Sequence, residues 1–183
     1  MQPLVEQAIQ IANEHQGAGY GLVFENSLGE ILKDTLQPDP AKGIECVYLV
    51  TAADLPRPIY IGSTIKGLLR FKDHLATYGQ SQFGQVVSAL GADCYPWMVS
   101  YIHSDVHRWG GFRRDETRLI IHFQPYIYGM AWGPYHHEKP EFIKRYEATL
   151  SATPTPRPPC STLAASAPIS VRPNWPTRLI SLV

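Results

Sequence analysis

The sequence predicts a mixed α/β (α+β) fold in which helices flank a small, three-stranded, mainly antiparallel sheet. Three runs rich in Val, Ile and Tyr, at residues 46–51, 58–62 and 97–103, are typical of β-strands. Segments with apolar residues three and four positions apart lie before, between and after these runs and predict helices. Residues 151–183 are rich in Pro, Ser, Thr and Ala without periodicity, so we expect a disordered tail.

The first 42 residues form an N-terminal addition. Residues 3–15 place their apolar side chains on one face of a helix. Residues 20–24 and 30–32 then flank the turn-like segment 26–29, which predicts a hairpin. This addition offers little chemistry, so it either buttresses the sheet or mediates contacts in a homodimer, and the sequence leaves both open.

A second hairpin begins the main domain, which we place at residues 43–150. Its predicted arms, residues 46–51 and 58–62, are joined by a turn segment rich in Pro and Asp. Each arm carries one tyrosine in an otherwise aliphatic run, Tyr48 on the first and Tyr60 on the second. The two phenols are therefore expected to lie beside one another on the sheet.

A helix should follow this hairpin directly. Gly62 ends the second arm, and Ser63 or Thr64 can cap the helix. Arg70 and His74 are four positions apart and so share one face of that helix. Its apolar side chains lie on a different face, which would pack on the sheet. An arginine and a histidine thus join the two tyrosines.

The rest of the main domain supplies a strand and three helices. We expect a helix at 83–90, the third strand at 97–103 and a helix at 140–150. The remaining helix carries Glu116, and at 100° per residue its apolar neighbours place this carboxylate at the centre of the apolar face. An unpaired charge there is costly, so a metal ion or a basic partner must compensate it. A salt bridge to Arg70 is the purely structural alternative.

Short motifs in this order resemble those of a known enzyme family. The hairpin carries Cys46-Val47-Tyr48 on its first arm and Tyr60-Ile61-Gly62 on its second. Arg70 follows Gly62 by eight residues, and His74 follows Arg70 by four. This pattern resembles the GIY-YIG nuclease family, with cysteine where the family has its first glycine.

A second match lies downstream and extends the resemblance over residues 43–128. Glu116 is followed by Leu119-Ile120 and, nine residues on, by Pro125, which is similar to the metal-binding helix of the family. The family usually has asparagine three residues after this proline, where this chain has Tyr128.

The resemblance implies a metal-dependent DNA endonuclease. Glu116 would bind Mg²⁺ or Mn²⁺, and the Arg70 guanidinium suits a phosphate in the transition state. Tyr48, Tyr60 or His74 would orient or deprotonate the attacking water, which requires a phenol pKa well below ~10. We expect these side chains to open onto one cleft. The residues expected to contact DNA are Gly62, Ser63, Thr64, Lys66, His107 and Arg108.

Two other functions remain open from the sequence. The chain could be a catalytically inactive nucleic-acid-binding module of the same fold, or a structural or interaction protein whose polar residues satisfy one another. Its net formal charge of zero argues weakly against nucleic acid as the partner. Its three cysteines lack metal-ligand spacing, and no run approaches the ~18 apolar residues of a membrane span. We therefore expect a cytoplasmic protein that does not bind membranes.

Overall fold

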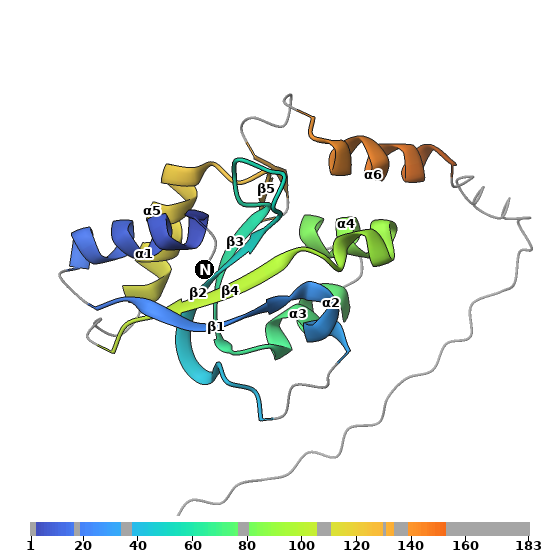
Figure 1. Cartoon of the computed structure of the whole chain (residues 1–183). Coiled ribbons are helices and arrows are strands. Elements are labelled where there is room, and N and C mark those ends of the chain that lie inside the picture. The colour runs from blue at the N-terminus through green and yellow to red at the C-terminus, as the bar shows by residue number, and fades with distance from the viewer. Residues whose placement is uncertain are drawn as a thin grey trace, which may run out of the picture. The chain divides into compact units, whose positions relative to one another are not determined.

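The structure is a computed structural model that describes residues 3–16, 19–33, 38–76, 81–105, 111–129, 131–133 and 139–152 (Figure 1). These residues belong to one unit, Met1–Thr153. The predicted disordered tail lies outside the described residues, apart from its first two residues, which end the last helix. In the described ranges no helix is long and apolar enough to cross a membrane.

The main sheet has four strands, all antiparallel. Their order is β1 (Gly21–Ser27), β4 (Met98–His103), β2 (Lys42–Thr51) and β3 (Tyr60–Lys66). The three predicted strands are therefore confirmed as β2, β3 and β4, but the predicted number of strands was wrong. The fourth strand, β1, pairs with β4, which is more than seventy residues away in the chain. A separate small sheet pairs β5 (Ile127–Tyr128) with β6 (Ala131–Trp132).

The hairpin predicted in the N-terminal addition is absent, because its turn segment begins a helix. Strand β1 ends at Ser27, and α2 (Leu28–Leu32) follows immediately. The Ser27 hydroxyl accepts a hydrogen bond from the backbone N–H of Glu30, which is the arrangement of a helix N-cap. Leu28 and Ile31 are buried in the core, so packing stabilises this helix in place of a second hairpin arm.

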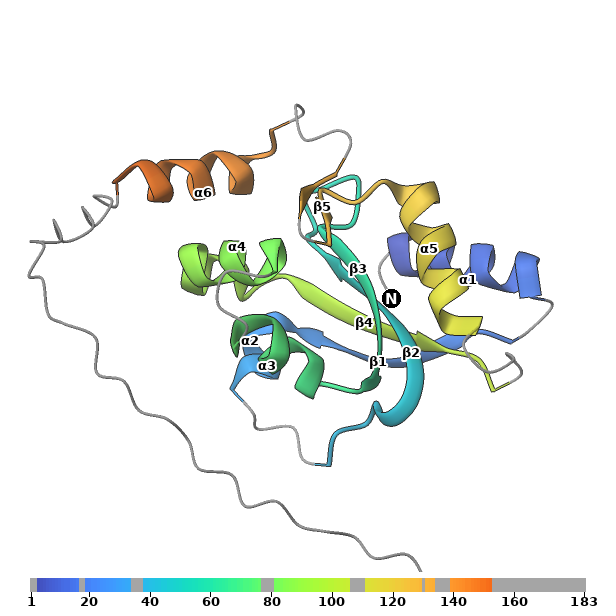
Figure 2. The same cartoon turned by 180° about the vertical axis from the view of Figure 1, so that it is seen from behind.

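Helices cover both faces of the main sheet (Figures 1 and 2). On one face lie α1 (Pro3–Gln16) and α5 (Gly111–Phe123). On the other lie α2, α3 (Leu69–Ala76) and α4 (Gln82–Leu90), with α6 (Glu141–Ala152) packed against α4. A 3-10 turn, η1 (Gly91–Cys94), links α4 to β4. The helices predicted for the N-terminus, for Arg70 and His74, for Glu116 and for residues 83–90 and 140–150 are thus confirmed.

Strand β3 is an edge strand and extends beyond its predicted end. Ser63 and Thr64 lie within it, so neither residue caps α3. The chain leaves the strand at Gly67, whose positive φ of +59 suits glycine, and α3 begins two residues later. Gly62 lies opposite Tyr48, and a Cβ on Gly62 would come within 2.3 Å of the Tyr48 hydroxyl oxygen. The glycine of the second motif is therefore required by packing on the first tyrosine.

Candidate active site at the edge strand β3

The two faces of the sheet at β2 and β3 carry different side chains. Because side chains alternate along a strand, Tyr48 and Tyr60 point into the core under α3 and α4, whereas Val47 and Ile61 point into the core under α1 and α5. The predicted site residues come from both sides.

On the α3 side the two tyrosines and His74 form one aromatic cluster. The Tyr48 hydroxyl lies 2.8 Å from His74 Nε2, and His74 Nδ1 lies 3.0 Å from the Ser81 hydroxyl. The Tyr48 and Tyr60 ring centroids are 6.0 Å apart, and the Tyr60 and His74 centroids are 5.4 Å apart. Tyr48 is fully buried and Tyr60 is 6% exposed. The predicted gathering of these three residues is therefore present, but it is closed to solvent.

Burial keeps this cluster uncharged. It raises the pKa of Tyr48 well above its usual value, and it raises that of Tyr60 although the nearby Arg70 opposes the change. Burial, assisted by Arg70, lowers the pKa of His74 to about 4. At neutral pH both phenols are protonated and the imidazole is neutral. The low phenol pKa that a general base would need is not found in this state.

Arg70 lies on α3 at the margin of the cluster, beside the Tyr48 and Tyr60 phenols. Its side chain is half-buried, and its Nε is buried without a hydrogen-bond partner. Among the described residues no carboxylate oxygen lies within 4.0 Å of its guanidinium. Arg70 lines an open pocket and its charge has no carboxylate partner among the described residues, so this arginine has capacity for an anion.

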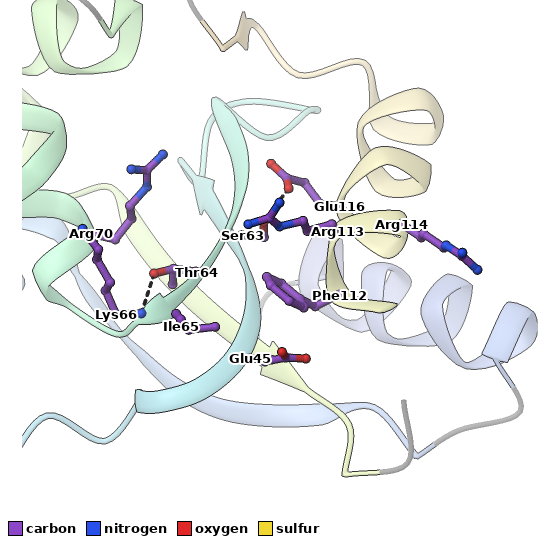
Figure 3. A pocket seen from close by; sticks show the side chains of 10 residues that line it. All are labelled: Glu45, Ser63, Thr64, Ile65, Lys66, Arg70, Phe112, Arg113, Arg114 and Glu116. Atoms are coloured by element: carbon purple, nitrogen blue, oxygen red, sulfur yellow. Dashed lines mark hydrogen bonds between the residues drawn. The ribbon is translucent and has the colours of Figure 1, made fainter. Parts of the chain in front are cut away.

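Glu116 reaches β3 from α5, on the opposite face. Its Oε2 accepts a hydrogen bond of 2.5 Å from the Ser63 hydroxyl. Burial raises the Glu116 pKa, against the effects of Ser63, Arg70 and Arg113. The salt bridge to Arg70 that we considered as the structural alternative is not formed. Figure 3 shows the two side chains on opposite sides of β3.

The expected position of Glu116 on its helix was wrong by one residue. The buried stripe of α5 runs through Phe112, Asp115, Leu119 and Phe123. Asp115 is 1% exposed and accepts a hydrogen bond from the Tyr20 hydroxyl, with Arg118 nearby. Because neighbouring residues on a helix differ by 100°, Glu116 is placed on the flank of this stripe and is half-buried.

Arg70 and Glu116 line one open pocket of about 910 Å³ (Figure 3). The two phenols do not line this pocket, so the expectation of one common cleft holds for only two of the four groups. Four basic and two acidic side chains surround the pocket. The lining residues are Glu45, Ser63, Thr64, Ile65, Lys66, Arg70, Phe112, Arg113, Arg114 and Glu116.

The residues expected to contact DNA have different surroundings. Ser63, Thr64 and Lys66 line the pocket, although Ser63 also holds Glu116, and Lys66 Nζ pairs with Asp73 at 2.7 Å. Gly62 is buried against Tyr48. The two remaining candidates, His107 and Arg108, lie outside the described residues.

Sequence reasoning missed Arg113 as a pocket residue. Its only local signal was its position three residues before Glu116, which places the two side chains on neighbouring parts of the helix surface.

The two residues that depart from the family motifs, Cys46 and Tyr128, differ in their burial. Cys46 is buried in the core, and burial raises the pKa of its thiol to about 12, so the thiol is not reactive there. Tyr128 is 50% exposed on β5. Neither residue lines the pocket.

The donors at the pocket suit a hard cation that keeps much of its water. No group of three or more His, Cys, Asp or Glu side chains that could hold a metal occurs in the described part of the chain. Mg²⁺ however needs only one or two carboxylates beside water and substrate oxygens. Glu116 is half-buried, and among the described residues no basic nitrogen lies within 4.0 Å of its carboxylate. A cation beside Glu116 fits this arrangement.

We compared the chain with family models, with curated proteins and with solved structures, and found no match in any of the three.

Proposed function

We propose that this protein is a metal-dependent endonuclease that hydrolyses phosphodiester bonds in DNA at the pocket beside β3. The observation that carries the proposal is that Arg70 and Glu116 line the same pocket. They come from helices on opposite faces of the sheet, line the same open pocket and do not pair with each other. The choice of DNA as the substrate follows from the resemblance of the motifs to those of GIY-YIG nucleases.

The charges of the pocket favour an anionic ligand. Its lining has an excess of two positive charges, although the whole chain has none. Three of the four basic side chains, Arg70, Arg113 and Arg114, have no carboxylate within 4.0 Å in the described structure. Arginine binds phosphate oxygens with two parallel hydrogen bonds, so a phosphodiester is a matching ligand.

Arg70 would stabilise the negative charge that develops on the phosphate during attack. Its buried Nε lacks an acceptor, and the surrounding aromatic side chains exclude water from that side. Electrostatic stabilisation is stronger where water is excluded. The part of the half-buried guanidinium that faces the pocket would donate hydrogen bonds to the bound phosphate.

Glu116 would hold the metal ion, and Ser63 would orient its carboxylate. A Mg²⁺ or Mn²⁺ ion in this position would supply Lewis-acid stabilisation of the phosphate and of the departing oxygen. The Ser63 hydrogen bond leaves the second carboxylate oxygen, Oε1, for other ligands. Ser63 therefore acts as a positioning residue in this proposal.

Tyr60 is the phenol whose electrostatics respond most directly to the pocket. Burial is the largest cause of its raised pKa, Arg70 opposes the rise, and Glu116 adds to it. Compensation of the Glu116 charge would therefore lower the Tyr60 pKa, while burial continues to raise it. Tyr48 and His74 support the phenol from beneath through ring contacts.

The test is cleavage of supercoiled plasmid and of oligonucleotides with Mg²⁺, with Mn²⁺ and with EDTA. The wild type should cut with either metal and not with EDTA. Glu116→Ala and Arg70→Ala should each lower the rate by ~10² or more. Glu141→Gln, which removes a carboxylate on the exposed surface of α6, is the control and should leave the rate unchanged.

The inactive binding module is the second candidate, because both phenols are buried and protonated. In that case the wild type cuts no DNA form with either metal, while Arg70→Ala still weakens DNA binding. The nuclease proposal is abandoned if the wild type gives no cut that Glu116→Ala removes.

A further inference from the structure

Arg113 and Arg114 are adjacent on α5 but differ in direction. Both are exposed and both line the pocket. In Figure 3 the Arg113 side chain extends from α5 towards β3 at the level of Ser63, whereas Arg114 extends away from the strand. Arg70 lies on the other side of β3 in the same view. Arg113 and Arg70 therefore approach the strand from opposite sides, with Glu116 and Ser63 near Arg113.

The charge of Arg113 is only partly compensated by its surroundings, through Glu116 three residues later, whose pKa it helps to lower. Arg113 lies in the first turn of α5, where the helix dipole disfavours positive charge, and that turn contains no acidic residue. In the described structure its guanidinium has no carboxylate within 4.0 Å. Its contact with the Phe112 ring, at 5.9 Å, is near the outer limit of such interactions. An anion in the pocket would relieve this electrostatic cost.

We propose that Arg113 binds a second phosphate of the substrate strand, next to the phosphate that Arg70 contacts. The strand would then cross the edge of β3, with Arg70 on one side and Arg113 on the other. This inference rests on the proposed function and specifies its substrate as a polynucleotide that presents at least two consecutive phosphates. Arg113 is a binding residue in this scheme and takes no part in bond cleavage.

The pair Arg113→Ala and Arg114→Ala supplies a matched test, because both variants lose one positive charge at neighbouring positions of one helix. Binding of a fluorescein-labelled duplex oligonucleotide is measured by anisotropy in EDTA over a series of salt concentrations. Arg113→Ala should raise Kd about five- to tenfold and reduce the slope of log K against log[salt] by about 0.9. Arg114→Ala removes a charge that also lines the pocket but extends away from β3, so it should raise Kd and reduce the slope less than Arg113→Ala does.

A conservative variant separates a phosphate contact from a structural role. Arg113→Lys keeps the charge but loses the planar fork, so it should restore the salt slope and only part of the affinity. In cleavage assays Arg113→Ala should raise KM for an oligonucleotide with little change in kcat. Equal melting temperatures of the three variants would show that the fold is intact.

Loss of the Arg113 phosphate contact and loss of the nuclease activity would give different results. If Arg113→Ala and Arg114→Ala change affinity and slope equally, or neither does, Arg113 is no specific phosphate ligand, whatever the cleavage result. If the wild type binds DNA, and Arg113→Ala weakens this binding more than Arg114→Ala does, the phosphate contact is supported. If the same wild type never cuts DNA, the proposed nuclease activity is contradicted. If the wild type binds no DNA, both proposals fall.

Discussion

The polar groups on the two sides of β3 differ in their burial and in their charge. On the α3 side Tyr48, His74 and Ser81 form a chain of contacts within a closed aromatic core, and burial keeps the two ring groups neutral. On the α5 side Glu116 has one hydroxyl partner and opens onto a pocket lined with arginines. The closed side is organised for stability and orientation. The open side has charges whose partners are incomplete, which is typical of a site that binds a ligand.

The largest expected effect is the separation of activity from stability on the open side. Glu116→Gln keeps the size of the side chain and removes its charge, so cleavage should fall by ~10² or more. The melting temperature should stay equal or rise, because a partly buried charge is removed. Plasmid nicking and a thermal melt on the same protein measure both. A fall in melting temperature of several degrees would instead assign Glu116 to the framework.

On the closed side we expect a loss of stability in mild acid. The pKa of His74 is lowered to about 4 in the folded state from 6.5 in the unfolded state. A depressed histidine pKa means that the unfolded chain takes up the proton first. The contribution of His74 is therefore complete above pH 6.5 and is lost as pH falls towards 4. At 1.36 kcal/mol per pH unit, about 2 kcal/mol is lost by pH 5.

Urea unfolding of the wild type and of His74→Gln between pH 7 and 5 measures this effect. Glutamine does not titrate, so the stability difference between the two proteins should shrink as the pH falls. A difference that stays constant over this range would contradict the burial of a neutral imidazole.

The adjacent carboxylates of α5 extend the comparison to a single helix. Asp115 is sealed between Tyr20 and Arg118, whereas Glu116 faces the pocket. Asp115→Ala removes the acceptor of a buried phenol and should lower the free energy of unfolding by about 1–3 kcal/mol. Glu116→Ala serves as its control and should not. Chemical denaturation of both variants gives the answer, and equal losses would remove the distinction between the two residues.

The smallest expected effect concerns the hydroxyl that holds Glu116. Ser63→Ala removes the hydrogen bond that opposes the rise in the Glu116 pKa, so this pKa should rise further. The cleavage rate should fall only a few-fold, and the acidic limb of its pH profile should move to higher pH. Ser63→Thr retains the hydroxyl and should restore the wild-type profile. An unchanged profile in Ser63→Ala would show that Ser63 does not position Glu116.

The elements that the sequence predicts well are those with strong local periodicity. Side chains that alternate between the two faces of a strand predict the paired arms around Tyr48 and Tyr60. Apolar residues three and four positions apart predict the helix that carries Arg70 and His74. These patterns depend only on neighbouring residues. They were sufficient to gather two phenols, an arginine and a histidine in one place.

The predictions that were wrong concern the strand that β1 pairs with and the direction in which Glu116 points from α5. The first depends on a segment distant in the chain, and the second on a rotation of one residue about the helix axis. The local pattern around β1 predicts a hairpin, but its partner in the structure is β4, which is distant in the chain. On α5 the pattern of apolar residues was correct, but a shift of one residue exchanges Asp115 and Glu116 between core and pocket. Such a shift is within the breadth of an apolar stripe, so the sequence alone does not resolve it.

By itself the sequence therefore determined the strands of the central hairpin, the helices that flank them and the residue types available for chemistry. Only the tertiary structure decided which of those residues line the same solvent-accessible pocket. Arg70 and Glu116 stand on helices that pack against opposite faces of the sheet, and they line one pocket because β3 is the edge strand between them. The order of strands in a sheet depends on pairing between segments far apart in the chain, which no local pattern records.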